Sequence, residues 1–287
     1  MAKRESKARS LETRIHETYA ALPNSERKLA DLILEFPGEV AAYSATELSE
    51  LAGVSKAAAT RFFRRLGFGS FEEARRLARD SRAWGSPLYL QSKSDPGSDP
   101  KADLQRYLDE EIAALHATFE DLDGAALSQI VDKIRRAKRL WLVGFRNSHF
   151  LAGYARYQFV QFRQNVLLLP AAGETLAESV AGMSRDDLVI VIGVRRRVRE
   201  LRTVMALIAK AGVPILYLTD PTARRTPGHA TWTIRCHVAS GFMFDSYVAA
   251  ISVLRFLAIE AFRLSGKSAR DHLKAVEHGH ETLKAFE

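Results

Sequence analysis

The chain has 287 residues, 47% of them hydrophobic, and carries a formal net charge of +8 with a sequence pI near 9.6. This length allows one large core or two modest ones, and the basic excess favours polyanionic partners. The single cysteine, Cys236, excludes an intramolecular disulfide and a cysteine-rich metal site, and it implies a reducing compartment. The sequence has no apolar leader and no run of eighteen apolar residues, so we expect a cytoplasmic protein that does not enter a membrane.

Two amphipathic helices are expected near the N-terminus. The first carries Ile15 and Tyr19 on one face, and the second begins at Asn24 or Ser25 and ends before Pro37. We expect these helices to supply the core against which the next segment packs.

Residues 44–68 are predicted to form two short helices joined by a tight turn. Ser44 is suited to cap the first helix, and Gly53 is suited to end it in the left-handed conformation. Ser55 is suited to cap the second helix, which Gly67 closes. This spacing is typical of a helix-turn-helix motif.

The second of these helices has an apolar face and a cationic face. At about 100° per residue, Ala59, Phe62 and Leu66 point one way, while small, hydroxylated and basic side chains point the other way. Small residues let a backbone approach the major groove, threonine and arginine reach base edges, and other cations contact phosphate. The predicted DNA-binding residues are Lys56, Ala57, Thr60, Arg61, Arg64 and Arg65. The alternative is a solvated basic face on an ordinary helix.

The region from residue 22 to residue 68 also carries a family pattern. The matching residues are Leu22, Ser25, Glu26, Arg27 and Ala30, followed by residues 47–48, 52–55, 60–62 and 65–68. With these residues the segment resembles the N-terminal domain of the RpiR/MurR family of bacterial transcriptional regulators. The resemblance implies a compact helical DNA-binding domain joined to a C-terminal sugar isomerase (SIS) domain that senses a phosphorylated sugar.

A further helix, capped by Ser70, is expected to close the first domain, for which we predict residues 1–83. From residue 56 to residue 82 there are eight Lys or Arg and three Asp or Glu, a local net charge of +5. More than half of the basic excess therefore lies in and just after the predicted recognition helix. The next residues, 84–102, are rich in Pro, Gly and Ser and are predicted to be a linker.

The remaining residues, 103–287, are predicted to form an α/β domain. After two helices, short apolar runs alternate with stretches of helical period, and the runs are 139–144, 166–169, 188–194, 214–218 and 231–236. Alternation of this kind predicts a five-stranded parallel sheet with helices on both faces, a three-layer α/β sandwich. The fold class is therefore an N-terminal all-α helix-turn-helix bundle followed by a doubly wound α/β domain.

Ligands of such sheets bind at the carboxyl ends of the strands, near helix N-termini. The loops after the first and third apolar runs offer amides, a hydroxyl and guanidinium groups to an anion. The predicted ligand-binding residues are Arg146, Asn147, Ser148, Arg195, Arg196 and Arg197. Glu174 and Thr175, after the second run, are interpreted as helix capping.

The resemblance to SIS domains extends from about Arg136 to Phe262, in strand order, helix spacing and the positions of Gly144 and Ser148. The loop after the third run departs from the family pattern, because it reads GVRRRV where SIS domains carry a Ser/Thr/Gly loop for the sugar phosphate. Its arginines are still suited to a carboxylate or a phosphate, so we predict a small anionic carbohydrate-derived effector. The alternatives are a solvated helix start, a subunit interface paired with a neighbour's acids, or a sensor without a ligand.

No catalytic or metal-ligating residues are predicted, and no cofactor. The eight histidines fall in no nucleophile, zinc or acid–base pattern, and there is no Gly-x-Ser-x-Gly, Walker or dinucleotide motif. SIS domains also occur in isomerases, so the rival hypothesis is a sugar-phosphate isomerase-type enzyme with an accessory helical domain.

Residues 245–262 are apolar on most of a helical circumference, and SIS domains resemble one another in pairing through such helices. We therefore expect a homodimer, or a tetramer of two dimers, and a dimer is also what a helix-turn-helix protein needs to bind two half-sites. Residues 266–287 are expected to form a further amphipathic helix. The sequence thus predicts a transcriptional regulator that binds a double-stranded DNA operator and responds to its effector by a population shift.

Overall fold

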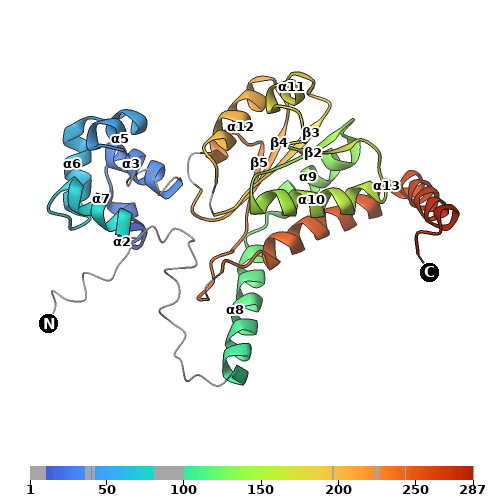
Figure 1. The fold of residues 1–287 in the computed structure, drawn as a ribbon, viewed down its shortest axis with the longest axis horizontal. Coiled ribbons are helices and arrows are strands. Elements are labelled where there is room, and N and C mark those ends of the chain that lie inside the picture. The colour runs from blue at the N-terminus through green and yellow to red at the C-terminus, as the bar shows by residue number, and fades with distance from the viewer. Residues whose placement is uncertain are drawn as a thin grey trace. The chain divides into compact units, whose positions relative to one another are not determined.

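The computed structural model describes residues 11–35, 40, 43–80, 100–195, 197–223, 226–242 and 244–286 (Figure 1). The chain divides into two compact units, residues 1–98 and residues 99–287, apart from short loop segments at 222–225 and 241–244. Most of the predicted linker, up to residue 99, lies outside the described residues, and residues 100–102 begin the first helix of the second unit.

The first unit is helical throughout its described residues. Its elements are α2 (Leu11–Thr18), η2 (Tyr19–Ala21), α3 (Asn24–Glu35), α5 (Ala45–Ala52), α6 (Lys56–Arg65) and α7 (Phe71–Asp80). The apolar residues that recur at helical spacing meet in one core, which includes Ile15, Leu29, Ile33, Leu48 and Phe62. The expected helices and their common core are therefore confirmed.

The helix-turn-helix is defined by the capping residues that the sequence indicates. Ser44 Oγ accepts from Glu47 N at 3.3 Å while Glu47 Oε2 accepts from Ser44 N at 2.7 Å, a complete capping box. Gly53 follows α5 with φ 65°, and Ser55 Oγ accepts from Ala58 N at 3.2 Å at the start of α6. Gly67, just after α6, has φ 83°. The left-handed conformation of both glycines explains why helices end there.

The second unit contains a five-stranded sheet in which every neighbouring pair is parallel. The strands are β1 (Leu140–Gly144), β2 (Val166–Leu169), β3 (Leu188–Gly193), β4 (Ile215–Thr219) and β5 (Trp232–Arg235), in the order β2-β1-β3-β4-β5. All residues of β1, β3 and β4 are buried, as expected for continuous apolar runs in a sheet that is covered on both faces.

Helices cover both faces of this sheet (Figure 1). The helices of this unit are α8 (Pro100–Glu120), α9 (Gly124–Arg136), α10 (Asn147–Val160), α11 (Leu176–Ala181), α12 (Glu200–Lys210) and α13 (Val248–Leu283), with the short η5 (Thr226–His229) before β5. Of these, α8 extends away from the sheet in Figure 1. In Figure 1, α9, α10 and α13 lie on one face of the sheet, and α11 and α12 lie on the other. The three-layer α/β sandwich is therefore confirmed.

The C-terminal segment α13 consists of two helices that meet at a break, as the sequence predicts. Gly266, with φ 61° and ψ −131°, interrupts it, and its last part runs in a different direction from its first part in Figure 1. Before the break, Val253, Leu254 and Leu257 belong to the core of the second unit, which explains why this stretch is apolar on most sides. Among the described residues, no helix combines the length and the apolar character that crossing a bilayer demands.

Candidate functional sites

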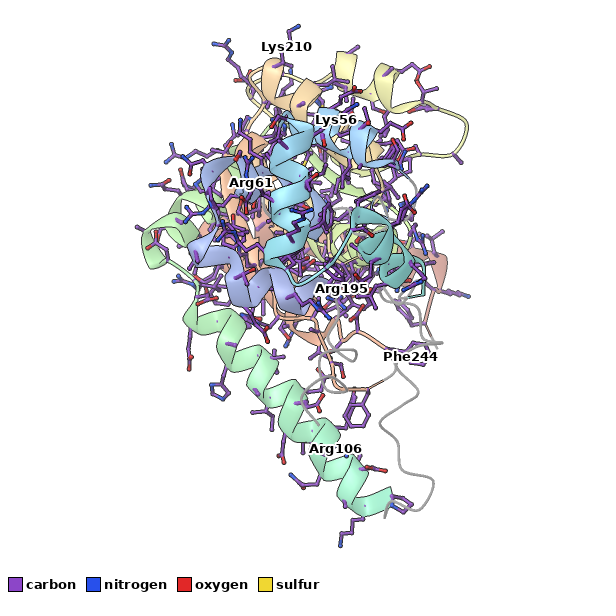
Figure 2. All side chains as sticks on the ribbon, turned by 90° about the vertical axis from the view of Figure 1, so that its left-hand side faces the viewer. Lys56, Arg61, Arg106, Arg195, Lys210 and Phe244 are labelled. Carbon is purple, nitrogen blue, oxygen red and sulfur yellow. The ribbon has the colours of Figure 1, made fainter. Side chains whose placement is uncertain are left out.

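The outward face of α6 consists of the side chains predicted to bind DNA. Ala58, Ala59, Phe62 and Phe63 are buried, whereas the six predicted residues are exposed. Figure 2 shows two of them, Lys56 and Arg61, along this helix. The face combines small side chains with cationic ones, which is the combination that a helix needs to enter a major groove.

Two arginines of this face contact a buried carboxylate. Arg65 Nε donates to Glu26 Oε2 at 2.9 Å, and Arg61 Nε lies 3.9 Å from Glu26 Oε1. The Glu26 side chain is 2% exposed, while Arg61 and Arg65 are 60% and 46% exposed. In the sequence, Glu26 stands out only as part of the family pattern, because a contact across 39 positions leaves no local signal.

The strand order places the two predicted ligand loops next to each other. β1 lies between β2 and β3, and Gly144, the last residue of β1, is in register with Ile192 near the end of β3. The chain goes from β1 to its neighbour β2 on one side and then to β3 on the other side, so the strand order reverses between β1 and β3. Open α/β sheets bind ligands in the crevice beyond the carboxyl ends of the strands at such a point.

The first loop is tightly packed against the start of α10. A Cβ on Gly144 would lie 2.1 Å from the carbonyl oxygen of Ser148, so only glycine fits at the end of β1. Arg146 adopts φ 55°, and both it and Asn147 are exposed, whereas Ser148 is buried. Two exposed polar side chains therefore lie at the N-terminus of α10, where the helix dipole favours an anion.

The arginines of the second loop pair with carboxylates of the same chain. Arg197 Nη1 donates to Asp220 Oδ2 at 2.5 Å, and both side chains are 1% exposed. The same Asp220 oxygen accepts from Arg195 N at 2.6 Å, and Arg195 Nε lies 3.0 Å from Asp245 Oδ1. Arg196 lies outside the described residues. Arg195 and Arg197 thus pair with acids of their own chain, whereas one alternative for this loop was pairing with acids of a neighbouring subunit.

The segment before α13 connects the second loop to α8. Asp245 pairs with Arg195, and the next residue, Ser246, donates from Oγ to Glu111 Oε2 on α8 at 2.6 Å. Ser246 Oγ also accepts from Val248 N at 3.2 Å, as a helix-capping hydroxyl does. Two adjacent side chains therefore bridge a predicted ligand loop and α8.

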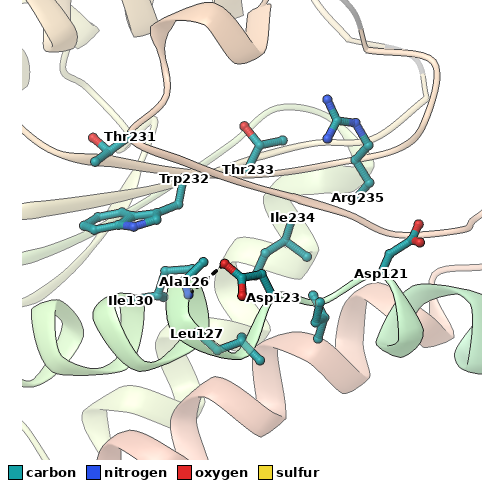
Figure 3. Close-up of a pocket in the computed structure, with 11 residues that line it drawn as sticks. Asp121, Asp123, Ala126, Leu127, Ile130, Thr231, Trp232, Thr233, Ile234 and Arg235 are labelled. Carbon is teal, nitrogen blue, oxygen red and sulfur yellow. Dashed lines mark hydrogen bonds between the residues drawn. The ribbon is translucent and has the colours of Figure 1, made fainter.

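Two cavities in the second unit lie apart from the predicted ligand loops. One, of about 370 Å³, lies between β5 and the start of α9, where Asp121 and Asp123 disfavour an anion (Figure 3). The other, of about 770 Å³, lies along the edge strand β2. Its wall includes Glu178, which forms a capping box with Thr175, and this confirms the interpretation of Thr175 as a helix cap.

Within the described ranges, no group of His, Cys, Asp and Glu is placed to hold a metal ion.

We expect the Cys236 thiol to be unreactive in the folded protein. Burial, assisted by the nearby Asp220 carboxylate, raises the pKa of this thiol to about 12, so the nucleophilic thiolate is scarce at pH 7–9. Iodoacetamide should label the native protein very slowly and the guanidinium-unfolded protein rapidly. Because the thiol ionises more easily once unfolded, the stability of the fold should fall as pH rises above about 9. Native labelling at the rate of an exposed thiol would contradict this placement.

Two family models match the two units of the chain. A helix-turn-helix domain model of the rpiR family matches residues 9–81, and a SIS domain model matches residues 133–260. The chain is 28% identical over 260 residues to the HTH-type transcriptional regulator HexR of Pseudomonas aeruginosa, covering 89% of this chain and 90% of that protein. It is 27% identical over 274 residues to YfhH of Escherichia coli K12, which is named an uncharacterized HTH-type transcriptional regulator. This match covers 88% of this chain and 95% of YfhH.

Solved structures share the fold. The NanR protein of Vibrio vulnificus, solved in complex with ManNAc-6P, matches with a TM-score of 0.59 at 19% identity, over 96% of this chain and 99% of that one. The sugar isomerase domain of an RpiR transcription factor from Sphaerobacter thermophilus matches with a TM-score of 0.57 at 24% identity, over 62% and 99%. These structures show the fold, and the two family models together with the relatives place the chain in the RpiR family of helix-turn-helix transcriptional regulators, with a C-terminal SIS domain.

Proposed function

We propose that this regulator binds a double-stranded DNA operator through α6 and that its SIS domain senses a small anionic carbohydrate derivative, a sugar phosphate or a sugar acid. The observation that carries the proposal is the exposed cationic face of α6, held in a capped helix-turn-helix. Thr60, Arg61 and Arg64 are assigned to base or groove contacts, and Lys56 and Arg65 to phosphate contacts. Ala57 allows the helix backbone to approach the groove. Its place of action would be the cytoplasm.

A homodimer is part of this proposal. On α8, Leu104, Tyr107, Leu108 and Ile112 are between 43% and 66% exposed, and their spacing places them along one side of the helix. An exposed apolar row of this kind marks a contact with another protein, and a second copy of the chain would bring two recognition helices to one operator.

The dimeric arrangement on DNA can be tested by footprinting on the chain's own upstream region. We expect two protected half-sites whose centres lie about one helical turn apart, or a small multiple of it. A single protected site, or protection that does not repeat, would contradict binding of one operator by the recognition helices of two subunits.

The crevice beyond β1 and β3 is the proposed effector site. Arg146, Asn147 and Ser148 supply a cation, an amide and a hydroxyl at a helix N-terminus, which suits a phosphate or carboxylate. The NanR structure named above holds a phosphorylated sugar in a protein of the same fold, which supports this class of ligand. Of the second loop, Arg195 and Arg196 are proposed to join the site, and Arg197 would do so only if its pair with Asp220 opened.

The contacts around Asp245 suggest how the effector would alter DNA binding. An anion that attracts Arg195 competes with Asp245, whose neighbour Ser246 is bonded to Glu111 on α8. In the sequence, α8 begins directly after the residues that join the two units. Loss of the contact between Arg195 and Asp245 would thus change the relative populations of two arrangements of α8, which is a population shift.

Glu111→Ala is expected to uncouple the two sites, because it removes the oxygen that accepts from Ser246 Oγ. The variant keeps both the ligand loops and α6, so candidate sugar phosphates and sugar acids that shift the melting temperature of the wild type should still shift it. The change in operator affinity on adding the same compound should fall by at least about threefold, the effect of a coupling loss near 0.7 kcal/mol. Asp109→Ala, at an exposed acid on the same helix, is the control. An undiminished response of operator affinity in Glu111→Ala would contradict this route.

The rival hypothesis, a sugar-phosphate isomerase, makes a different prediction. An isomerase converts aldose phosphates to ketose phosphates, whereas the proposed regulator binds without turnover. The relatives reported above are named transcriptional regulators, which favours a regulator over an isomerase. Incubation of the purified protein with a panel of aldose and ketose phosphates decides between them, and measurable interconversion would favour the enzyme.

A further inference from the structure

Glu26 occupies an unusual position for a carboxylate. It lies in the first turn of α3 and is buried where α3 packs against α6. Its two oxygens face two arginines of α6 that are one helical turn apart, at 2.9 Å from Arg65 Nε and 3.9 Å from Arg61 Nε. A single buried group of α3 thus contacts two members of the proposed DNA-binding face.

Stability alone does not explain a charged residue at this position. Burying a carboxylate is costly unless it is paired, and replacement of a buried ion pair by apolar residues of similar size is often neutral or stabilising. The N-terminus of α3 and the Arg65 guanidinium offset the cost here. The carboxylate is hydrogen-bonded to one exposed arginine of α6, Arg65, and lies 3.9 Å from a second, Arg61.

We propose that Glu26 is a positioning residue of the DNA interface. Its carboxylate contacts Nε of Arg65 and, at a longer distance, Nε of Arg61. These contacts orient the Nη1 and Nη2 atoms of both guanidinium groups before DNA binds. This inference rests on the proposed DNA binding by α6. The phosphate contact assigned to Arg65, which fixes the register of α6 on the operator, and the base contact assigned to Arg61 both depend on such geometry, whereas non-specific binding depends mainly on the number of cations near phosphates.

The effect of removing this carboxylate follows from that difference. Without Glu26 the arginines must be ordered during binding, so affinity for the operator falls. Affinity for unrelated DNA stays the same or rises, because the face has lost one negative charge. The ratio of the two affinities is therefore the quantity that reports positioning.

The test measures binding of the full-length protein to its own upstream fragment and to unrelated DNA of equal length. Glu26→Gln is expected to lower the affinity ratio about tenfold. Glu26→Met, which fills similar space without charge, should keep the fold and show the same loss. The control is Glu72→Gln, which makes the same charge change at an exposed acid paired with Arg75, and its ratio should change less than twofold.

A second comparison separates positioning from a structural role. In an Arg65→Gln background the main group that Glu26 holds is missing, so Glu26→Gln should change the ratio less than threefold. An undiminished tenfold loss in that background, or equal ratios for Glu26→Gln and Glu72→Gln, would overturn the inference while leaving the regulator intact. A wild-type protein that does not distinguish the two DNAs would instead overturn the proposed function, and this inference with it.

Discussion

Arg197→Met is expected to lower the free energy of unfolding by about 3–5 kcal/mol, the cost of leaving one partner of a buried ion pair without the other. Arg197 and Asp220 are each 1% exposed, and the substitution leaves the Asp220 carboxylate without its guanidinium. Arg195→Met should cost only about 1 kcal/mol, because the pair of Arg195 with Asp245 is nearer the solvent. Urea denaturation of the three proteins measures both differences.

The double variant Arg197→Met with Asp220→Asn provides the control for this result, because an amide oxygen at position 220 can still accept from Arg195 N. It removes both charges together, so most of the lost stability should return. The competing assignment, in which Arg197 serves chiefly as an effector contact, predicts a different outcome. It requires Arg197→Met to unfold at the same urea concentration as the wild type while its response to sugar phosphates disappears.

Arg61→Ala is expected to weaken operator binding about 100-fold. A well-placed arginine contributes about 1–3 kcal/mol of discrimination at one base pair, and a dimer loses that contact in both half-sites. Arg61 lies in the middle of the exposed face of α6 and is 60% exposed, so truncation should not disturb the core. Equilibrium binding to the upstream fragment measures the loss, and the melting temperature should remain that of the wild type.

The matched control is Arg76→Ala on α7, which removes an exposed arginine from the same unit. It makes the same charge change, so it accounts for the general attraction between a basic domain and DNA. We expect it to lower the affinity less than threefold. If both alanine variants bound the operator equally well, the recognition face would have to lie elsewhere in the first unit.

The parts of this fold that were predictable depend on local signals. Ser44, Gly53, Ser55 and Gly67 specify the helix-turn-helix because caps and left-handed turns restrict which residues fit. The five apolar runs identify the strands to within one or two residues because a sheet buried on both faces needs continuous apolar segments. Both signals act over a few neighbouring positions and can therefore be read in a single sequence.

The side-chain pairs at the sites were not predictable in the same way. Glu26 and Arg65 are 39 positions apart, and Arg197 and Asp220 are 23 positions apart. The pairing of a given carboxylate with a given arginine depends on how the elements pack. The composition and the local sequence pattern do not predict that packing. The sequence therefore indicated a cationic second loop but not that Asp220 and Asp245 already pair with two of its arginines.

The division of the C-terminal segment into two helices also depends on a local signal. Gly266 has φ 61° and ψ −131°, which is not helical, and helical residues lie on both sides of it, so the further helix expected for residues 266–287 is confirmed. Ala269 is buried after the break and belongs to the core of the second unit, so tertiary packing holds the start of this last helix. That packing contact was not predictable from the sequence.

Selective affinity for DNA through α6 is tested most directly by a salt series. The purified protein is titrated against fragments of its own upstream region and against unrelated DNA of equal length, at several salt concentrations. We expect tight binding to one fragment, with an affinity that falls steeply with salt, by a log–log slope of about −0.9 for each phosphate contacted. Binding that fails to distinguish the fragments at every salt concentration, with and without candidate sugar phosphates and sugar acids, would contradict it.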